Sequence, residues 1–423
     1  MKVMLVNPYF PRYRGNDAFP LGIGYIAGAL LKSGFDVSVL DCHILKIQED
    51  EMISHILKER PDVIGFTVMT PTFEVLKRIV AKLRERSDAL IIGGGPHATF
   101  RPDELLSSGF DIAVRGEGER TVVELVEKLE KHENLESIRG ISFISNKKIV
   151  HTQERELEKN LDLIPFPARR LFPYKKYKIM SLVTSRGCSY TCVYCAATKF
   201  WKGFVRFRTP QNVLDELEEI KALGFDKIRF EDSTFTINHE HVRGICKEMI
   251  ERGLDFRWSC ETRPDTLNKD LLELMKRAGC VLLCVGVDSG SQNILNVAKR
   301  KLSTDMIIKA FELTKEVGIR TRAYVVFGLP GENESSVKET ITLLEKIKPD
   351  QLMLSLATIY PGTELEGAQS FRLPEDWVMK FGGHGIGADL FLPEGLAVEE
   401  YKRLAELLLQ HVKNLRTPEK NKK

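Results

Sequence analysis

Three cysteines lie close together in the segment Ser185-Arg186-Gly187-Cys188-Ser189-Tyr190-Thr191-Cys192-Val193-Tyr194-Cys195. Three residues separate the first pair of cysteines, and two residues separate the second pair. A loop of this length can wrap three thiolates around one corner of a [4Fe–4S] cluster, for which cysteine is the usual ligand. Three ligands leave one iron open, and an open iron is what a cluster needs if it is to bind a substrate.

Two other chemistries compete for the same cysteines. A zinc site needs four protein ligands, or three and a water, and the near flanks Gly187, Ala196 and Ala197 supply none. Ordinary free thiols are the other alternative. Disulfides are not expected, because the chain shows no secretory signal. The spacing therefore favours an open-iron cluster and leaves zinc and unligated thiols open.

The composition bounds the class of protein. The chain has 423 residues, enough for two or three domains, and 43% of them are hydrophobic. Its 62 basic and 59 acidic residues nearly balance, which argues against nucleic-acid binding driven by phosphate contacts. No window approaches the roughly 18 apolar residues of a membrane span. We expect a soluble, cytoplasmic protein that has no transmembrane segment and binds no nucleic acid.

The N-terminal third alternates short β-rich runs with amphipathic helices. Strands are predicted at 2–7, 36–41, 63–67, 90–93 and 112–115, and helices at 21–33, 48–59, 72–86, 102–107 and 119–131. Strict alternation predicts an α/β fold with a doubly wound parallel sheet, whose ligands bind at the carboxyl ends of the strands. Polar or small residues follow four of these strands, in Asn7-Pro8-Tyr9, Thr67-Val68-Met69-Thr70, Gly93-Gly94-Gly95-Pro96-His97 and Arg115-Gly116-Glu117-Gly118-Glu119. A tight strand–helix turn is the alternative explanation of the glycine run.

The alternation resumes after residue 178 with a longer period. Strands are predicted at 179–184, 227–231, 256–262, 281–287, 322–327 and 351–358, and helices near 210–223, 240–252, 268–278, 303–317 and 334–346. Six β/α units predict a partial barrel that is open on one side. Chemistry in such barrels sits at the carboxyl ends of the strands, and the cysteine loop follows the first of them.

Other segments set the predicted domain boundaries. A hairpin is predicted at 141–150 with its turn at Asn146-Lys147, and three prolines in 161–173 predict an extended linker. The glycine-rich stretch 382–387 predicts a flexible loop in which His384 either contacts substrate or is an ordinary loop residue, and a helix is predicted near 397–414. We therefore divide the chain into a Rossmann-like domain (1–150), a linker (151–178), a partial barrel (179–365) and a helical extension (366–423).

The remaining cysteines show no second cluster motif. Cys280 and Cys284 are four residues apart in one predicted strand and are therefore expected on the same strand face, whereas Cys246 and Cys260 are isolated. We expect all four to be buried thiols.

The Cys-x3-Cys-x2-Cys spacing, with Tyr194 before the third cysteine, resembles the radical S-adenosylmethionine (SAM) superfamily. The resemblance implies that Cys188, Cys192 and Cys195 bind a [4Fe–4S] cluster, that SAM chelates the open iron, and that Tyr194 lies near the adenine. It also implies SAM contacts at the barrel strand ends, from Glu231, Asp232, Ser259, Glu261, Arg263, Asp288, Ser289 and Gly328. The alternatives are a helix cap for the Glu231–Asp232 pair and a surface ion pair for Glu261 and Arg263. The family often has Glu where this chain has Asp288.

The N-terminal third resembles the cobalamin-binding domain of one large radical SAM branch. The resemblance implies that cobalamin is held by Tyr9, Thr67, Met69, Thr70, Gly93, Gly94, Gly95, His97 and Glu117. The loop after the first strand lacks the histidine with which many cobalamin enzymes ligate cobalt, so we expect no histidine ligand on the lower cobalt face. His43 follows the second strand, the wrong place for that ligand, and is expected to be a surface or packing residue.

The resemblance implies a radical SAM enzyme in which reductive SAM cleavage gives a 5′-deoxyadenosyl radical. Cobalamin-dependent methylation of an unactivated carbon or phosphorus centre, in a small molecule or lipid, is the leading hypothesis. A cyclase, oxidase or rearrangement enzyme without methyl transfer is the second hypothesis, and a non-catalytic cobalamin or metal sensor is the third. An electron donor such as flavodoxin or ferredoxin is implied as partner.

Overall fold

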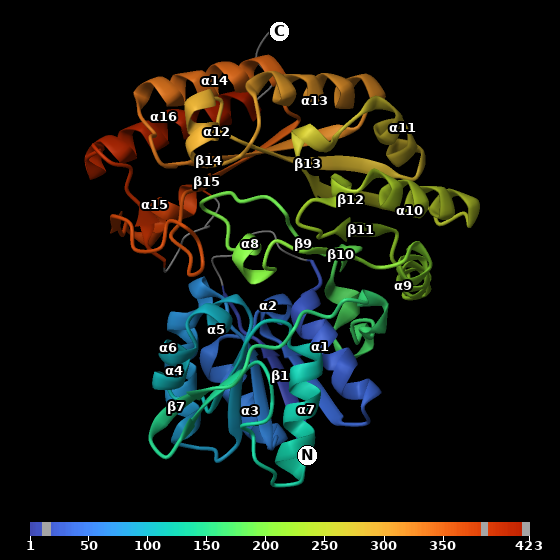
Figure 1. Ribbon diagram of the computed structural model, residues 1–423, viewed down its shortest axis with the longest axis vertical. Helices are drawn as coiled ribbons and strands as arrows, with labels where there is room; N and C mark the ends of the chain where they lie inside the picture. The colour runs from blue at the N-terminus through green and yellow to red at the C-terminus, as the bar shows by residue number, and fades with distance from the viewer. Residues whose placement is uncertain (11–17, 382–387, 417–423) are drawn as a thin grey trace. The chain divides into compact units, whose positions relative to one another are not determined.

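In the computed structural model, residues 1–10, 18–381 and 388–416 are described. The chain forms two compact units, Met1–Ile179 and Met180–Lys423 (Figure 1). The linker residues belong to the first unit, and the finer division of the chain into four segments stays a prediction. The loop 382–387 with His384, and residues 11–15 after the first strand, lie outside the described residues.

The first unit is built on a seven-stranded sheet in the order β2-β1-β3-β4-β5-β6-β7. Its parallel part consists of β1 (Lys2–Asn7), β2 (Asp36–Asp41), β3 (Val63–Thr67), β4 (Leu90–Gly94) and β5 (Ile112–Val114). The connecting helices are α1 (Leu21–Lys32), α2 (Cys42–Leu45), α3 (Glu49–Glu59), α4 (Thr70–Arg84), α5 (Pro96–Phe100), α6 (Pro102–Ser107) and α7 (Glu119–Glu130). The doubly wound sheet is confirmed, and the strand order reverses between β1 and β3, where such sheets bind ligands.

Burial explains why these strands and helices form. The four central residues of β1 are fully buried, as expected of a parallel strand that helices cover on both faces. In α4 the apolar residues Phe73, Leu76, Ile79, Val80 and Leu83 recur at helical spacing and are all buried. They pack with residues of β1, β3 and β4 in one hydrophobic core.

An antiparallel hairpin, β6 (Ile141–Ser145) and β7 (Lys148–His151), extends this sheet beyond β5. Asn146 and Lys147 form its turn with φ angles of 50° and 62°. Positive φ at both central residues is typical of the type I′ turn, which matches the twist of the flanking strands. The predicted hairpin is confirmed.

The proline-rich linker packs on α1. After the end of β7 at His151 it contains three 3-10 turns, at Leu161–Leu163, Arg169–Leu171 and Tyr174–Lys176, but no α-helix or strand. A Cβ on Gly28 would lie 2.2 Å from the Phe166 carbonyl oxygen, so only glycine allows this approach. The Ala168 amide donates to the Gly24 carbonyl at 3.0 Å. The linker is therefore held on the helix by its backbone.

Tyr177 anchors the far end of the linker. Its ring packs edge-on against Phe19, and its hydroxyl donates to the buried carboxylate of Asp41 at the end of β2. Asp41 also accepts from the Asn7 amide at 2.9 Å and caps α2. The carboxyl edge of the sheet and the linker are thus joined by one carboxylate.

The second unit is built on a six-stranded parallel sheet in the order β15-β14-β13-β12-β11-β8. The strands are β8 (Met180–Leu182), β11 (Lys227–Phe230), β12 (Arg257–Thr262), β13 (Cys280–Asp288), β14 (Arg320–Phe327) and β15 (Gln351–Leu356). The main covering helices are α9 (Pro210–Ala222), α10 (His239–Glu251), α11 (Lys269–Arg277), α12 (Gln292–Val297), α13 (Thr304–Val317) and α14 (Glu334–Ile347). The predicted partial barrel is confirmed.

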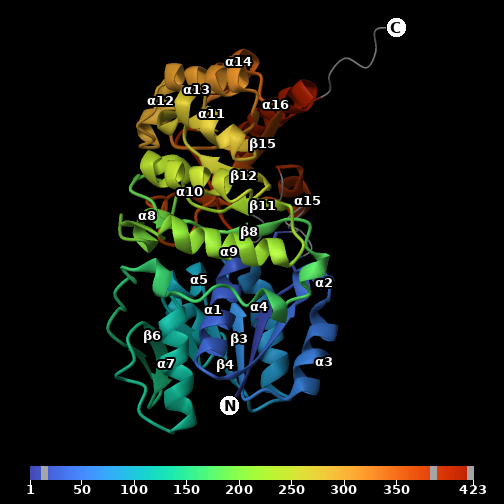
Figure 2. The ribbon, with the colours of Figure 1, turned by 90° about the vertical axis from the view of Figure 1, so that its right-hand side faces the viewer.

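Helices cover one face of this sheet, and Figure 2 shows α9, α10, α11, α13 and α14 following one another along it. In β12, Trp258, Cys260 and Thr262 are buried toward these helices, whereas Ser259 and Glu261 alternate with them and are only half-buried. We call the face that bears Ser259 and Glu261 the inner face. It carries several polar side chains, unlike a packed barrel interior.

The C-terminal part contributes α15 (Glu375–Val378), a short antiparallel pair of β16 (Ser370–Phe371) with β17 (Leu390–Phe391), and α16 (Val398–Arg416). Tyr401, Leu404 and Leu408 of α16 are buried, and α16 packs beside α14 and β15. No helix in the described residues is both long and apolar enough to cross a membrane.

One prediction about the cysteines is wrong. The pairing of β12 with β13 shifts register between Trp258 and Ser259, so that Trp258 pairs with Cys280 and Ser259 pairs with Leu282. The extra residue in β13 is a β-bulge, which reverses the alternation of the side chains after it. Cys280 contacts Cys260 on the helix side, and Cys284 faces Tyr324 on the inner side.

We predict that Gly28→Ala destabilises the first unit by roughly 1–3 kcal/mol, because its methyl group overpacks against the Phe166 carbonyl. Gly22→Ala is the matched control: it lies on the same helix, is exposed, and has nothing within 4 Å of an added Cβ. That variant should be stabilised by up to about 1 kcal/mol from helix propensity. Denaturant unfolding followed by circular dichroism measures both, and equal effects would contradict the close linker contact.

Candidate functional site

The cysteine loop begins directly after the first strand of the six-stranded sheet. Ser185–Gly187 forms β9, which pairs antiparallel with β10 (Val205–Phe207) and closes the loop at its base. Gly187 has φ 113°, and a Cβ there would lie 1.8 Å from the Phe204 carbonyl oxygen. Between the two strands lie the three cysteines and the short helix α8 (Ala197–Phe200). Sequence reasoning missed this two-stranded base, because each of its strands is only three residues long.

Asp232 holds the start of the loop. Its carboxylate is buried and accepts from the Thr184 amide at 3.1 Å, from the Thr184 hydroxyl at 2.8 Å and from the Ser185 hydroxyl at 2.5 Å. Burial raises the pKa of Asp232, and these donors oppose the shift. Because protein donors already surround this carboxylate, we propose that Asp232 positions the loop instead of meeting the SAM ammonium group.

Arg300 lies against the second cysteine of the loop. Its Nη1 is 3.3 Å from Cys192 Sγ, its Nη2 donates to the Gly286 carbonyl at 3.0 Å, and its Nε pairs with Asp288. Arg300 and Asp288 are both buried, and Asp288 has the positive φ of 61°. Burial, followed by the charge of Asp288, raises the pKa of Tyr194. Tyr194, Asp288 and the cysteine loop therefore lie together, and their contacts with SAM stay a prediction.

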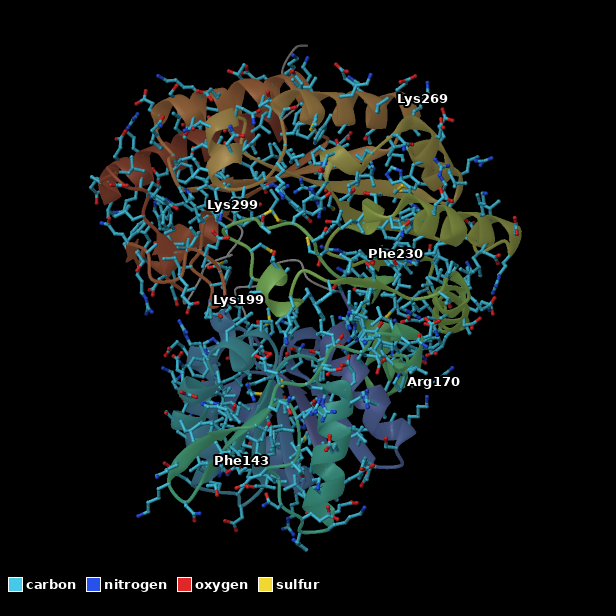
Figure 3. The ribbon with its side chains drawn as sticks, viewed as in Figure 1. Phe143, Arg170, Lys199, Phe230, Lys269 and Lys299 are labelled. Atoms are coloured by element: carbon cyan, nitrogen blue, oxygen red, sulfur yellow. The ribbon has the colours of Figure 1, made fainter. Side chains whose placement is uncertain are left out.

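Sequence reasoning missed Arg300. It lies in Ala298-Lys299-Arg300-Lys301, where both neighbouring lysines are exposed. Figure 3 labels Lys299, which marks the turn after α12 that hydrogen-bonds to the cysteine loop through Ala298 and Val193. Nothing in the sequence distinguishes the one buried cation in this basic run.

The Arg263 guanidinium is hydrogen-bonded to other residues of the protein. It forms two hydrogen bonds to Asp265, at 2.9 and 3.1 Å, and donates to the Arg300 carbonyl at 2.7 Å. It also lies 3.5 Å from the centroid of the Tyr190 ring. Its Nη1 has no hydrogen-bond partner within the described residues, so the contact of Arg263 with the SAM carboxylate stays a prediction.

The other predicted carboxylates lie on the inner face. Glu231 accepts from the Ser181 hydroxyl at 2.8 Å, and burial raises its pKa. Glu261 accepts from Arg229 at 2.6 Å and from the Tyr324 hydroxyl at 3.4 Å. Ser259 lies two residues earlier on the same face and is half-buried. The contacts of these groups with the ribose and ammonium of SAM stay a prediction.

Gly328 and Ser289 lie in two turns that the protein itself stabilises. Gly328 has φ 85°, its amide donates to Glu332 at 3.2 Å, and a Cβ there would lie 2.6 Å from the Tyr401 hydroxyl. Ser289 lies 3.2 Å from the Thr340 hydroxyl. The structure thus gives both residues a packing role at strand ends, and their contact with SAM stays a proposal.

The chemistry of the cysteine loop fits a cluster. Burial raises the pKa of Cys188, and it raises that of Cys195 to about 11; the charge of Cys192 adds to both shifts. A metal centre that binds all three as thiolates offsets this cost. No group of three or more His, Cys, Asp or Glu in the described part of the chain is arranged to hold a metal ion. Cysteines of a [4Fe–4S] cluster bind different irons, so their sulfurs need not converge as zinc ligands must.

In the first unit, some of the residues predicted to bind cobalamin are partly exposed and others are tightly packed. Thr67 is half-buried, Met69 is 44% exposed, and a Cβ on Gly94 would meet nothing closer than 3.7 Å. They lie beside the switch point, with Tyr9 half-buried after β1 and Thr70 half-buried at the start of α4. The exposed Met69 side chain and the space beside Gly94 are compatible with a ligand at this edge, and the cobalamin contacts of these residues stay a prediction.

The packed residues serve the fold. A Cβ on Gly93 would lie 2.8 Å from Leu105, and one on Gly95, whose φ is 112°, would lie 2.9 Å from the Val68 carbonyl.

His97 is buried, stacks on Phe73 at 4.2 Å and lies 3.2 Å from the Thr70 hydroxyl. Burial lowers its pKa to about 4. Glu117 accepts from the Glu158 amide at 2.9 Å. Cobalamin contacts from these residues stay predictions.

Two family models match the chain: the radical SAM superfamily over residues 182–344 and the B12 binding domain over residues 12–126. An uncharacterized methyltransferase of Pyrococcus horikoshii is 31% identical over 384 residues, which cover 86% of this chain and 82% of that protein. The chain belongs to the radical SAM superfamily. Its B12-binding domain places it in the cobalamin-binding branch, so the predicted cofactors, a [4Fe–4S] cluster, SAM and cobalamin, are confirmed for this radical SAM enzyme.

Two further relatives extend the comparison. The anaerobic magnesium-protoporphyrin IX monomethyl ester cyclase of Cereibacter sphaeroides is 29% identical over 389 residues, which cover 86% of this chain and 63% of the cyclase. The radical SAM methyltransferase TsrM of Kitasatospora setae, solved with cobalamin and a [4Fe–4S] cluster bound, has a TM-score of 0.81 at 19% identity. That match covers 100% of this chain and 90% of TsrM and confirms the fold.

We predict that Asp232→Asn lowers the iron and sulfide content of anaerobically reconstituted protein. The amide keeps the shape but loses one acceptor, which leaves a donor of Thr184 or Ser185 unsatisfied at a cost of roughly 1–3 kcal/mol. Glu231→Gln is the matched control at the neighbouring position and should keep its iron. Chemical iron and sulfide analysis measures both; full loading of Asp232→Asn would remove its positioning role.

A second prediction concerns pH. Burial raises the pKa of Glu332 to about 7, although hydrogen bonds from Ser336 and from the amides of Gly328 and Leu329 act to lower this pKa. The folded protein then holds this proton more tightly than the unfolded chain. The contribution of the Glu332 proton to the free energy of unfolding is complete below about pH 4.5. This contribution, roughly 3 kcal/mol, is lost as the pH rises through 7. Glu332→Gln should abolish this fall in the free energy of unfolding, measured by denaturant titration at several pH values; parallel profiles would contradict it.

Proposed function

We propose that this radical SAM enzyme transfers a methyl group to an unactivated carbon or phosphorus centre of a small molecule or lipid. One observation carries the proposal: a loop with three free cysteines lies at the carboxyl edge of a half-barrel, with the buried Arg300 against Cys192. The names of the relative from Pyrococcus horikoshii and of TsrM support methyl transfer as the reaction class.

The chain's own residues divide the work. Cys188, Cys192 and Cys195 are the proposed cluster ligands, and Asp232 with the β9–β10 base fixes the loop that carries them. Glu231, Ser259 and Glu261 offer the polar contacts for SAM, and Arg300, which is paired with Asp288, holds Cys192 in place. Thr67, Met69 and Gly94 are the proposed cobalamin contacts. When bound, the cluster and SAM supply a 5′-deoxyadenosyl radical and cobalamin supplies a methyl group.

The inner face also shields the reaction. The cysteine loop packs through Val193 and Tyr194 against a cluster of apolar residues from α12 and the ends of β14 and β15. Packing of this kind keeps water from reactive groups, which would otherwise be quenched. The protein thus contributes geometry and exclusion of water.

A second function, radical chemistry without methyl transfer, is favoured by the 29% identity to the cyclase of Cereibacter sphaeroides. SAM that is isotopically labelled in its methyl group separates the two. Label in the product means methyl transfer, whereas an unlabelled product with 5′-deoxyadenosine means cyclisation, oxidation or rearrangement. A reduced, cluster-loaded protein that cleaves no SAM would support the sensor hypothesis.

We predict that Cys188→Ala, Cys192→Ala and Cys195→Ala each abolish the iron–sulfur absorption and the release of 5′-deoxyadenosine. Cys246→Ala is the matched control, because this cysteine is buried in α10 away from the loop and should leave both intact. The assay uses anaerobic reconstitution and reduction by dithionite or by flavodoxin, the proposed electron donor. SAM cleavage that persists in any of the three loop variants would overturn its assignment as a ligand.

A further inference from the structure

Strand register places four inner-face residues in one row across the half-barrel. Glu261 of β12 pairs with Cys284 of β13, Cys284 with Arg322 of β14, and Arg322 with Gln351 of β15. Paired residues of neighbouring parallel strands point to the same face and are about 4.8 Å apart. The row therefore has a carboxylate on the β12 side and a guanidinium on the β14 side.

The two charges in this row do not meet. Glu261 pairs with Arg229 of the neighbouring strand β11, and their side chains are 35% and 27% exposed. Glu261 is two strands away from Arg322, about 10 Å along the sheet, and Cys284 lies between them. The carboxylate on this face is thus already neutralised by a partner other than Arg322.

Arg322 is oriented without being neutralised. Its Nε donates to the Gln351 side-chain oxygen at 2.8 Å, and its Nη2 donates to the same oxygen. Gln351 is a neutral amide, and no carboxylate in the described residues forms an ion pair with Arg322. The side chain is half-buried, so its charge lacks both a counter-ion and full hydration.

The strand row next to Arg322 is connected to the cysteine loop by hydrogen bonds. One row further along the strands lie Gly286, Tyr324 and Met353, and the Gly286 carbonyl accepts from Arg300, which contacts Cys192. A step of two residues along a strand is about 7 Å. A group bound at Arg322 would therefore lie on the inner face of the partial barrel, one row from Gly286, which is linked to the cysteine loop through Arg300.

From these contacts we infer that Arg322 binds an oxyanion of the substrate, either a carboxylate or a phosphoryl group, inside the half-barrel. A guanidinium held by a neutral amide keeps its remaining donors for a planar or tetrahedral anion. The substrate body would then extend past Tyr324 and Met353 toward the cluster loop. This inference rests on the proposed function and narrows its substrate to an acidic molecule.

The test uses anaerobically reconstituted full-length protein and phenylglyoxal, which modifies arginine side chains. Mass spectrometry follows the rate of modification at Arg322 in the presence of acetate, methylphosphonate or the neutral match acetamide. Arg320 is the internal control, because it lies on the same strand and is exposed. When the concentration of the anion that fits is about four times its dissociation constant, modification of Arg322 should be about fivefold slower. The rate of modification at Arg320 should not change.

Protection by acetate alone identifies a carboxylate site, protection by methylphosphonate alone identifies a phosphoryl site, and protection by both supports a general oxyanion site. Equal rates with and without either anion, or equal protection by acetamide, would overturn the inference. Gln351→Leu, which removes the acceptor that orients Arg322, should reduce the protection at least twofold, and unchanged protection would also count against the inference. Release of 5′-deoxyadenosine by the wild-type protein is measured separately, because its absence would contradict the proposed function without affecting the protection assay.

Discussion

The candidate site depends on the hydrogen bonds that the buried carboxylate of Asp232 accepts from Thr184 and Ser185. Asp232 follows β11, yet its hydrogen bonds go to Thr184 and Ser185, which precede the cysteine loop. A carboxylate without water around it is stable only when donors satisfy it, and here those donors belong to the chain that must be fixed. Arg300 approaches the same loop from the turn after α12. The loop is therefore held by groups from two other β/α units, so its geometry requires the folded half-barrel.

This arrangement explains why the two faces of the six-stranded sheet differ. The helix side carries the stabilising core, with Trp258, Phe230 and Phe235 in mutual ring contact. The inner face carries arginine, glutamate, serine and glutamine side chains that add little by burial of apolar surface. Stability and chemistry are thus assigned to opposite sides of the same strands, and side-chain alternation along each strand keeps them apart.

Most of the fold could be predicted from the sequence, because its strands and helices are long and strongly patterned. The predicted strands 2–7, 36–41 and 63–67 match β1, β2 and β3 at both ends. The cysteine loop was also found from spacing alone. Arg300 could not be found, because it meets Cys192 across 108 residues of sequence and has exposed basic neighbours. The bulge in β13 could not be found either, because one inserted residue changes the facing of Cys284 without changing the hydrophobic pattern.

The hairpin β6–β7 has a consequence for the solution behaviour of the first unit. Without it, the three-residue strand β5 would end the sheet with its hydrogen-bonding groups uncovered. The hairpin moves that edge to β7, a short strand with exposed Lys148, Ile149 and His151 that follows a tight, twisted turn. Charged, twisted edge strands are poor templates for pairing with another chain. The hairpin therefore protects a parallel sheet from intermolecular strand addition and aggregation.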